Sequence, residues 1–152
     1  MNERMLPTVV IRPARPADRE SIDRLLVAAK LPLAGVADPV AEFLVASTSD
    51  GLVGTVGVEC YPPFGLLRSV AVDESQRGRG LGALLVARAI QRARLREIAT
   101  LYLLTTSAAD YFPRFGFRTV ARAELPAELL ASEELKGAYP ETAVCMELPI
   151  AN

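Results

Sequence analysis

Residues 70–82 read Val70-Ala71-Val72-Asp73-Glu74-Ser75-Gln76-Arg77-Gly78-Arg79-Gly80-Leu81-Gly82. The stretch begins as an apolar strand, passes through a turn rich in glycine and arginine, and enters a helix predicted for residues 80–97. The first N–H groups of a helix have no partner within the helix, and they lie at the positive end of its dipole. Glycines let an anion approach these groups because no Cβ intervenes. The stretch therefore predicts a phosphate-binding site.

Two common phosphate-binding motifs do not fit this stretch. The P-loop needs a Lys after its last glycine, and no Lys occurs between Lys30 and Lys136. The dinucleotide fingerprint spaces its glycines by two and then three positions, whereas Gly78, Gly80 and Gly82 are spaced evenly. The Arg-Gly-Arg-Gly run also allows a solvated turn or an RNA contact. The class of ligand must therefore come from the rest of the chain.

Composition narrows the classes of function. The chain has 152 residues, of which 51% are hydrophobic, so we expect a single domain over residues 1–152 with its core at about 8–149. The net charge of −1 argues against a nucleic-acid partner. There is no histidine, which excludes every mechanism based on one, and Cys60 and Cys145 form no zinc motif, so we expect no metal. We find no signal peptide and no membrane span, and expect a cytoplasmic protein.

Hydrophobic periodicity predicts alternating strands and helices. Strands are predicted at residues 9–11, 43–48, 53–60, 66–72, 101–104, 117–120 and 143–148. Helices are predicted at residues 19–29, 80–97, 108–115 and 126–135, the second with Leu81, Leu84, Leu85 and Ile90 facing the core. A meander followed by crossovers gives a protein of the α/β (α+β) class, with a mixed sheet and helices on both faces.

Several motifs together resemble the GNAT superfamily of acyl-CoA N-acyltransferases. The pattern Arg-x-x-Gly-x-Gly at residues 77–82 is similar to the family's pyrophosphate signature. The first strand with Asp18, the strand exit at residues 70–73 and the aromatic motif at residues 112–117 follow in the family's order. The resemblance covers about 140 residues. It implies a mostly antiparallel sheet with a V-shaped cleft between the strands at 66–72 and 101–104.

The resemblance also implies acetyl-CoA as cosubstrate. By similarity, the pantetheine and thioester lie along Val70, Ala71 and Val72. The pyrophosphate lies on Arg77, Gly78, Arg79, Gly80, Leu81 and Gly82. The acceptor amine attacks directly, without an acyl-enzyme, after losing a proton to a base.

The catalytic and acceptor residues are less clearly indicated. Many family members carry a tyrosine acid where this chain has Phe112, and Tyr111 stands one residue earlier, about 100° away on a helix. Tyr111 is the candidate acid and Glu59 the candidate base. Arg68 and Ser69 are unusual in an apolar strand. Arg68 either pairs with Glu59 or, with Ser69, binds a carboxylate of the acceptor.

The C-terminal third resembles small bacterial acetyltransferases associated with arsenic resistance and the acetyltransferase domain of N-acetylglutamate synthases. This resemblance implies N-acetylation of a small, amino-acid-like amine, with a link to arsenic resistance as one option. Two alternatives stay open: a CoA-binding regulatory or structural protein without turnover, and a protein or peptide N-acetyltransferase. Homodimers are common in the family, so the resemblance allows one.

Overall fold

The computed structural model describes residues 8–151, and within them seven strands form one sheet. The strands are β1 (Val10–Pro13), β2 (Ala41–Thr48), β3 (Gly51–Tyr61), β4 (Phe64–Val72), β5 (Thr100–Thr105), β6 (Arg118–Val120) and β7 (Val144–Pro149). Their order is β1-β2-β3-β4-β5-β7-β6. Only the contact between β4 and β5 is parallel; the other neighbours are antiparallel. The predicted mixed, mostly antiparallel sheet is confirmed.

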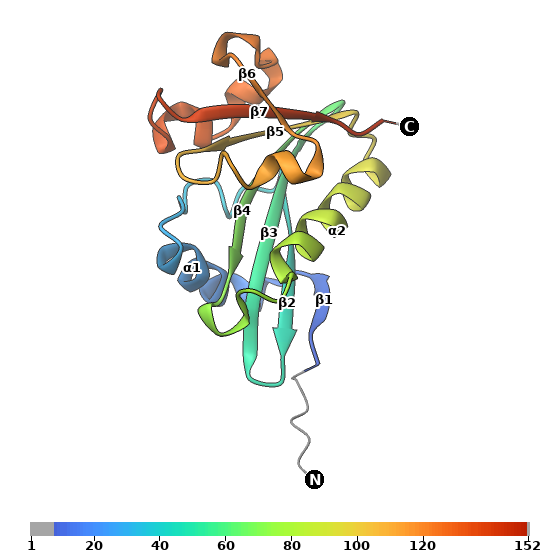
Figure 1. The fold of residues 1–152 in the computed structure, drawn as a ribbon, viewed down its shortest axis with the longest axis vertical. Coiled ribbons are helices and arrows are strands. Elements are labelled where there is room, and N and C mark those ends of the chain that lie inside the picture. The colour runs from blue at the N-terminus through green and yellow to red at the C-terminus, as the bar shows by residue number, and fades with distance from the viewer. Residues whose placement is uncertain (1–7, 152) are drawn as a thin grey trace.

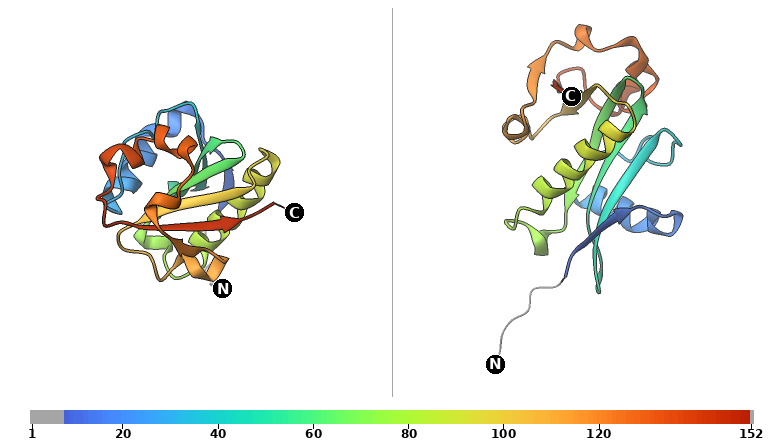
Figure 2. Two further views of the ribbon diagram at one scale, coloured as in Figure 1. Left: turned by 90° about the horizontal axis from the view of Figure 1, so that it is seen from above. Right: turned by 90° about the vertical axis from the view of Figure 1, so that its right-hand side faces the viewer.

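Two α-helices cover opposite faces of this sheet (Figure 1, Figure 2). Helix α2 (Leu81–Leu95) packs on β3, β4 and β2, and its buried side chains are Leu81, Leu85, Val86, Ala89 and Ala93. Helix α1 (Arg19–Ala28) packs on the other face through Ile22, Leu25 and Leu26. Truncating a fully buried leucine such as Leu85 to alanine typically costs about 2–5 kcal/mol. No helix within the described range is long and apolar enough to cross a membrane.

Short turns complete the chain. They are η1 (Pro16–Asp18), η2 (Glu74–Gln76), η3 (Phe112–Phe115), η4 (Arg122–Glu124), η5 (Ala127–Ala131) and η6 (Glu134–Ala138). Figure 1 shows β5 and β7 crossing the end of the sheet formed by β1 to β4, with the η5 and η6 segment beside them.

Three sequence predictions about helices were wrong. The predicted helix 108–115 is only the single turn η3, because Pro113 has no N–H and fits only in the first turn of a helix. The predicted helix 126–135 breaks into η5 and η6, since Ser132 is extended and its hydroxyl accepts a hydrogen bond from the N–H of Glu134 at 3.2 Å. Leu84 is 43% exposed, because Leu81, Leu85 and Ala89 define the face of α2 that meets the sheet.

The entry to α1 is held by an ion pair. Arg12 donates two hydrogen bonds to the Asp18 carboxylate, at 2.7 and 3.0 Å. Asp18 also accepts the N–H of Arg15 at 2.7 Å. The Arg12 hydrogen bond is the main reason that the pKa of Asp18 is lowered to about 2.

Candidate active site

The sheet opens between β4 and β5. These strands pair only over Phe64–Leu66 and Thr100–Tyr102, so β4 has no strand partner on that side beyond Leu66. An irregularity in the pairing of β3 and β4 lies between Thr55 and Gly57, opposite Ser69, which has a φ of +59°. Such a bulge bends a strand and increases its twist. The V-shaped opening predicted between the two strands is therefore present.

A pocket of about 610 Å³ lies along this opening. One wall is the end of β4, the second is the glycine-rich loop with the start of α2, and the third is the segment after β5. Its lining residues are Val70, Val72, Gln76, Arg77, Gly78, Gly80, Leu81, Gly82, Ala83, Ser107, Ala108, Asp110, Tyr111, Phe112 and Arg114.

The glycine-rich loop has the backbone of an anion cradle. Gly78 and Gly80 have φ values of +80° and +79°, and a Cβ on either would point into open space. Gly80 is the N-cap of α2, and its carbonyl accepts the N–H of Leu84 at 3.1 Å. Since Leu84 makes the first hydrogen bond of the helix, the N–H groups of Leu81, Gly82 and Ala83 have no partner within it. Leu81, Gly82 and Ala83, which carry these free donors, all line the pocket, where an anion could accept from them.

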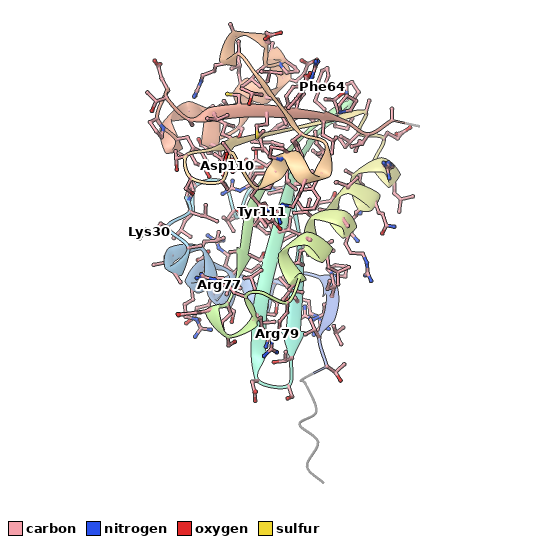
Figure 3. All side chains as sticks on the ribbon, viewed as in Figure 1. Lys30, Phe64, Arg77, Arg79, Asp110 and Tyr111 are labelled. Carbon is pink, nitrogen blue, oxygen red and sulfur yellow. The ribbon has the colours of Figure 1, made fainter. Side chains whose placement is uncertain are left out.

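Local hydrogen bonds explain the shape of this loop. The Asp73 carboxylate accepts hydrogen bonds from the hydroxyl and the backbone N–H of Ser75, which lower its pKa. The Arg77 side chain donates to the carbonyl oxygen of Val72 at 3.3 Å. Figure 3 shows Arg77 and Arg79 on this loop. Of the residues expected to bind acetyl-CoA, Ala71 and Arg79 do not line the pocket; Ala71 packs in the core beside α1.

Tyr111 lies in the pocket wall opposite the loop (Figure 3). A Cβ on Gly82 would lie 3.1 Å from its hydroxyl oxygen, so the hydroxyl sits over the first turn of α2. Partial burial raises the pKa of Tyr111, which keeps its proton in place at neutral pH. Phe112 instead packs into the core against Phe117. The expected 100° rotation assumed an α-helix; the helical turn begins only at Phe112, so that argument does not apply to Tyr111.

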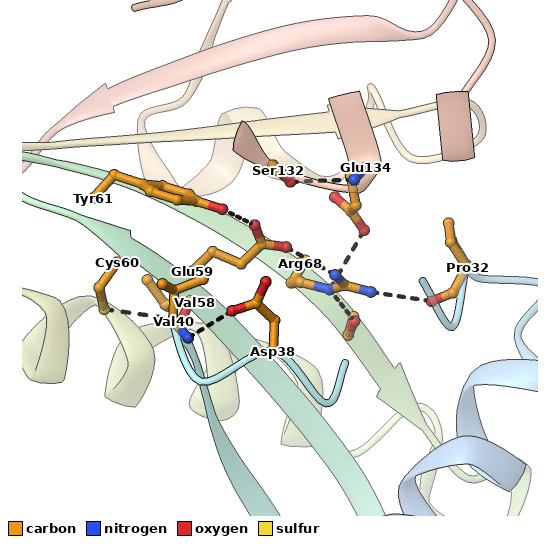
Figure 4. A network of polar contacts seen from close by, with 11 residues as sticks. Pro32, Asp38, Val40, Val58, Glu59, Cys60, Tyr61, Arg68, Ser132 and Glu134 are labelled. Atoms are coloured by element: carbon orange, nitrogen blue, oxygen red, sulfur yellow. Dashed lines mark hydrogen bonds and ion pairs between the residues drawn. The ribbon is translucent and has the colours of Figure 1, made fainter. Parts of the chain in front are cut away.

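Glu59, Arg68 and Ser69 form a buried polar cluster that does not line the pocket. Figure 4 shows Glu59 and Arg68 within this cluster. Arg68 donates to the Oε2 atom of Glu59 at 2.8 Å and to the Oγ atom of Ser69 at 2.9 Å. It also donates to the carbonyl oxygen of Pro32 at 3.2 Å. The Arg68–Glu59 pair, one of the two alternatives for Arg68, is thus present in the structure. The same guanidinium also extends from β4 toward the η6 segment.

Sequence reasoning missed a fourth member of this cluster, Glu134. Its Oε2 atom lies 3.5 Å from the Nε atom of Arg68, and its side chain is 1% exposed. Burial raises its pKa to about 7, while the charge of Arg68 lowers it and that of Glu59 raises it further. Nothing in a predicted helix at 126–135 distinguishes Glu134 from Glu133. The residues that Glu134 meets, Arg68 and Glu59, lie on strands far away in the sequence.

Comparison with known proteins identifies the family. The model of the acetyltransferase (GNAT) domain family matches residues 39–119, more than half of the chain. The chain belongs to the GNAT acetyltransferase family. This GNAT domain is therefore an acyl-CoA N-acyltransferase, and its reaction is acetyl-CoA-dependent acetylation of an amine.

Relatives of this GNAT domain include enzymes named for amino acids. It is 29% identical over 130 residues to an amino-acid acetyltransferase of Mycobacterium tuberculosis, covering 79% of this chain and 74% of the relative. It resembles Rv2747 of the same species, solved with CoA and NLQ, with a TM-score of 0.75, 27% identity and coverage of 92% and 98%.

The fold is also that of N-acetylglutamate synthase from Neisseria gonorrhoeae, solved with coenzyme A and N-acetyl-glutamate. The TM-score is 0.81 at 22% identity, and the match covers 97% of this chain but only 36% of the synthase chain. The GNAT domain thus spans about a third of that longer protein, and the likeness to it is one of fold.

Proposed function

We propose that this GNAT domain transfers the acetyl group of acetyl-CoA to the amine of a small, amino-acid-like acceptor. The observation that carries the proposal is the pocket along the unpaired edge of β4, which ends at the glycine-rich loop before α2. The acceptor class is supported by the M. tuberculosis amino-acid acetyltransferase that the chain resembles.

The pocket suits acetyl-CoA, which supplies an activated acetyl thioester. We assign the pyrophosphate to Gly78, Gly80, Leu81 and Gly82, because all four line the pocket and a Cβ on Gly78 or Gly80 would meet nothing within 4 Å, with Arg77 adding positive charge. The strand edge at Val70 and Val72 offers backbone groups to the pantetheine amides, since β5 does not pair there. Ala71 contributes only through its backbone, because its side chain faces the α1 side of the sheet. Arg79, outside the pocket lining, supplies charge at the rim.

Tyr111 is the proposed acid for the departing thiolate. Its hydroxyl faces the pocket over Gly82, and its raised pKa keeps it protonated. A hydroxyl in this position favours turnover over a regulatory role, since it offers an acid even though this chain has Phe112 where many family members carry a tyrosine. A thiol is a good leaving group, so we expect Tyr111 to assist the step without being essential for it.

Release of CoA thiol tests this proposal. Acetyl-CoA is incubated with a panel containing L-glutamate, L-glutamine, an arsenical amino acid, benzylamine and short peptides, and the thiol and the acetylated product are measured together. The proposal expects the amino acids to give the highest kcat/KM. Preference for peptides, or acetyl-CoA binding without transfer to any amine, would contradict it.

A further inference from the structure

Glu134 has an unpartnered oxygen. Among residues 8–151, no group donates a hydrogen bond to its Oε2 atom, although the side chain is 1% exposed. The nearest cation is Nε of Arg68, at 3.5 Å, and that N–H already donates to Ser69. A buried carboxylate oxygen without a donor is costly, so the missing partner is a hydrogen-bond donor.

Glu59 is not available for the same role. Its Oε1 atom accepts the hydroxyl of Tyr61 at 2.6 Å, and its Oε2 atom accepts Arg68 at 2.8 Å. Both of its oxygens are therefore occupied, which argues against Glu59 as the base. Two carboxylates on one guanidinium give the cluster a net charge of −1 when both are ionised. A primary ammonium group would supply both the missing donor and the missing positive charge.

The cluster also adjoins the pocket along β4. Val70 lines the pocket, and the preceding residue, Ser69, forms the bulge of β4. Ser69 contacts Arg68, and Arg68 contacts Glu134 on η6 (Figure 4). The Oε2 atom thus lies one contact away from β4, the strand on which we place the thioester, through Arg68 two positions before Val70.

We propose that Glu134 binds the ammonium group of the acceptor and takes its proton. This inference rests on the proposed function. The ammonium transfers one proton to Oε2, and its nitrogen lone pair forms the bond to the acetyl carbon. The carbon–sulfur bond breaks, and its electron pair leaves with the sulfur. Tyr111 donates its proton to that sulfur and regains one from the second proton of the amine, and Glu134 returns its own proton to water.

The surroundings of Glu134 suit proton transfer near neutral pH. Burial raises its pKa to about 7, Arg68 opposes this rise and Glu59 adds to it. The other titratable groups of the cluster are Tyr61 on β3 and Tyr139 after η6, and both have raised pKa values that keep them protonated. Asp38, on the loop after α1, is exposed and adds negative charge near Tyr61. A base whose pKa lies near the working pH is the most effective.

Access to Glu134 requires one movement. A Cβ on Gly35 would lie 3.0 Å from Arg68 and 3.4 Å from Glu133, so the loop after α1 meets the η6 segment directly over the guanidinium. The ammonium group reaches Glu134 when these two segments separate.

The test compares Glu134→Gln with Glu133→Gln, an exposed neighbour on the same segment. The probe is L-glutamate, or the fastest amine of the panel, at saturating acetyl-CoA from pH 5.5 to 9. Loss of a positioned base typically lowers the rate by about 100-fold or more. We expect such a fall in kcat for Glu134→Gln. The decrease of kcat below about pH 7, the acidic limb of the pH–rate profile, should disappear, and the acetyl-CoA affinity should stay unchanged. Glu133→Gln should match the wild type.

The pH dependence of kcat in Glu59→Gln distinguishes a base from a purely structural Glu134, because a structural residue would not set this dependence. Removing the Glu59 charge lowers the pKa of Glu134, so the acidic limb should move to lower pH. A second measurement needs no turnover: carboxyl ¹³C NMR should show Glu134 titrating near pH 7 and responding to the amine. If a variant fails to fold, this titration in the wild type decides.

Two results would overturn the inference. The first is wild-type kcat and an unchanged acidic limb in Glu134→Gln; the second is titration of Glu134 near pH 4.5. Either would leave the proposed function intact if the wild type still acetylates amines. Absence of transfer to every amine by the wild type would instead remove both proposals.

Discussion

Replacing Glu134 by glutamine should change how the stability of the protein depends on pH. In the folded protein the pKa of this carboxyl is raised from 4.5 to about 7, mainly by burial. Between these values the folded state holds a proton that the unfolded state has released. The free energy of unfolding therefore falls as the pH rises from about 4.5 to 7, and the contribution of Glu134 is lost above pH 7.

The size of this effect follows from the shift. Each pKa unit corresponds to about 1.4 kcal/mol, so a rise from 4.5 to about 7 amounts to about 3 kcal/mol. The free energy of unfolding of Glu134→Gln, minus that of the wild type, should increase by about this amount between pH 4.5 and 7.5. Glutamine keeps the size of the side chain but cannot ionise.

Urea unfolding followed by circular dichroism at constant ionic strength measures this difference. Glu133→Gln is the control, and its curve should run parallel to that of the wild type. Parallel curves for Glu134→Gln and the wild type would refute the reasoning, because they would mean that the buried carboxyl titrates at an ordinary pKa.

Two further substitutions test other parts of the structure. Asp18→Asn should lower stability at pH 7 by about 2 kcal/mol, because it removes the ionised partner of Arg12 and the lowered pKa of about 2. The loss should shrink to about half at pH 3, where the Asp18 carboxyl of the unfolded wild type is mostly protonated while that of the folded protein stays ionised; a loss independent of pH, measured by urea unfolding, would contradict the ion pair. Tyr111→Phe should lower kcat by about 10-fold or more while the acetyl-CoA affinity is kept, as a general acid requires. An unchanged kcat in stopped assays of acetylated product would show that the thiolate leaves without its help.

The sequence predicted the parts of the fold that local patterns determine. The strand ending at Val72, the glycines at 78 and 80 and the apolar face of α2 are contiguous, so periodicity and backbone chemistry locate them together. The helix predicted at 108–115 was wrong because one proline decides where helical hydrogen bonding can start. The helix predicted at 126–135 was wrong because the Ser132 side chain replaces a backbone hydrogen bond.

The buried cluster marks the limit of sequence reasoning. The pairing of Arg68 with Glu59 could be proposed because adjacent strands bring them together. Glu134 joins them only through the packing of η6 against Arg68 of β4, and no spacing in the sequence encodes that contact. The position of the Tyr111 hydroxyl over Gly82 likewise depends on how the turn at η3 packs on α2.

The central claim is that acetyl-CoA binds at the glycine-rich loop, and calorimetric titration of acetyl-CoA into Gly80→Val and Gly137→Val tests it most directly. Both glycines have positive φ values and open space around a built Cβ, but Gly137 lies outside the pocket. The control, with a φ of +122° against +79° for Gly80, therefore carries backbone strain of its own without obstructing the loop. We predict that Gly137→Val binds acetyl-CoA as the wild type does, and that folded Gly80→Val binds it about 10- to 100-fold more weakly, as expected for losing one hydrogen bond to a charged group. Equal affinity in the two variants would contradict the assignment.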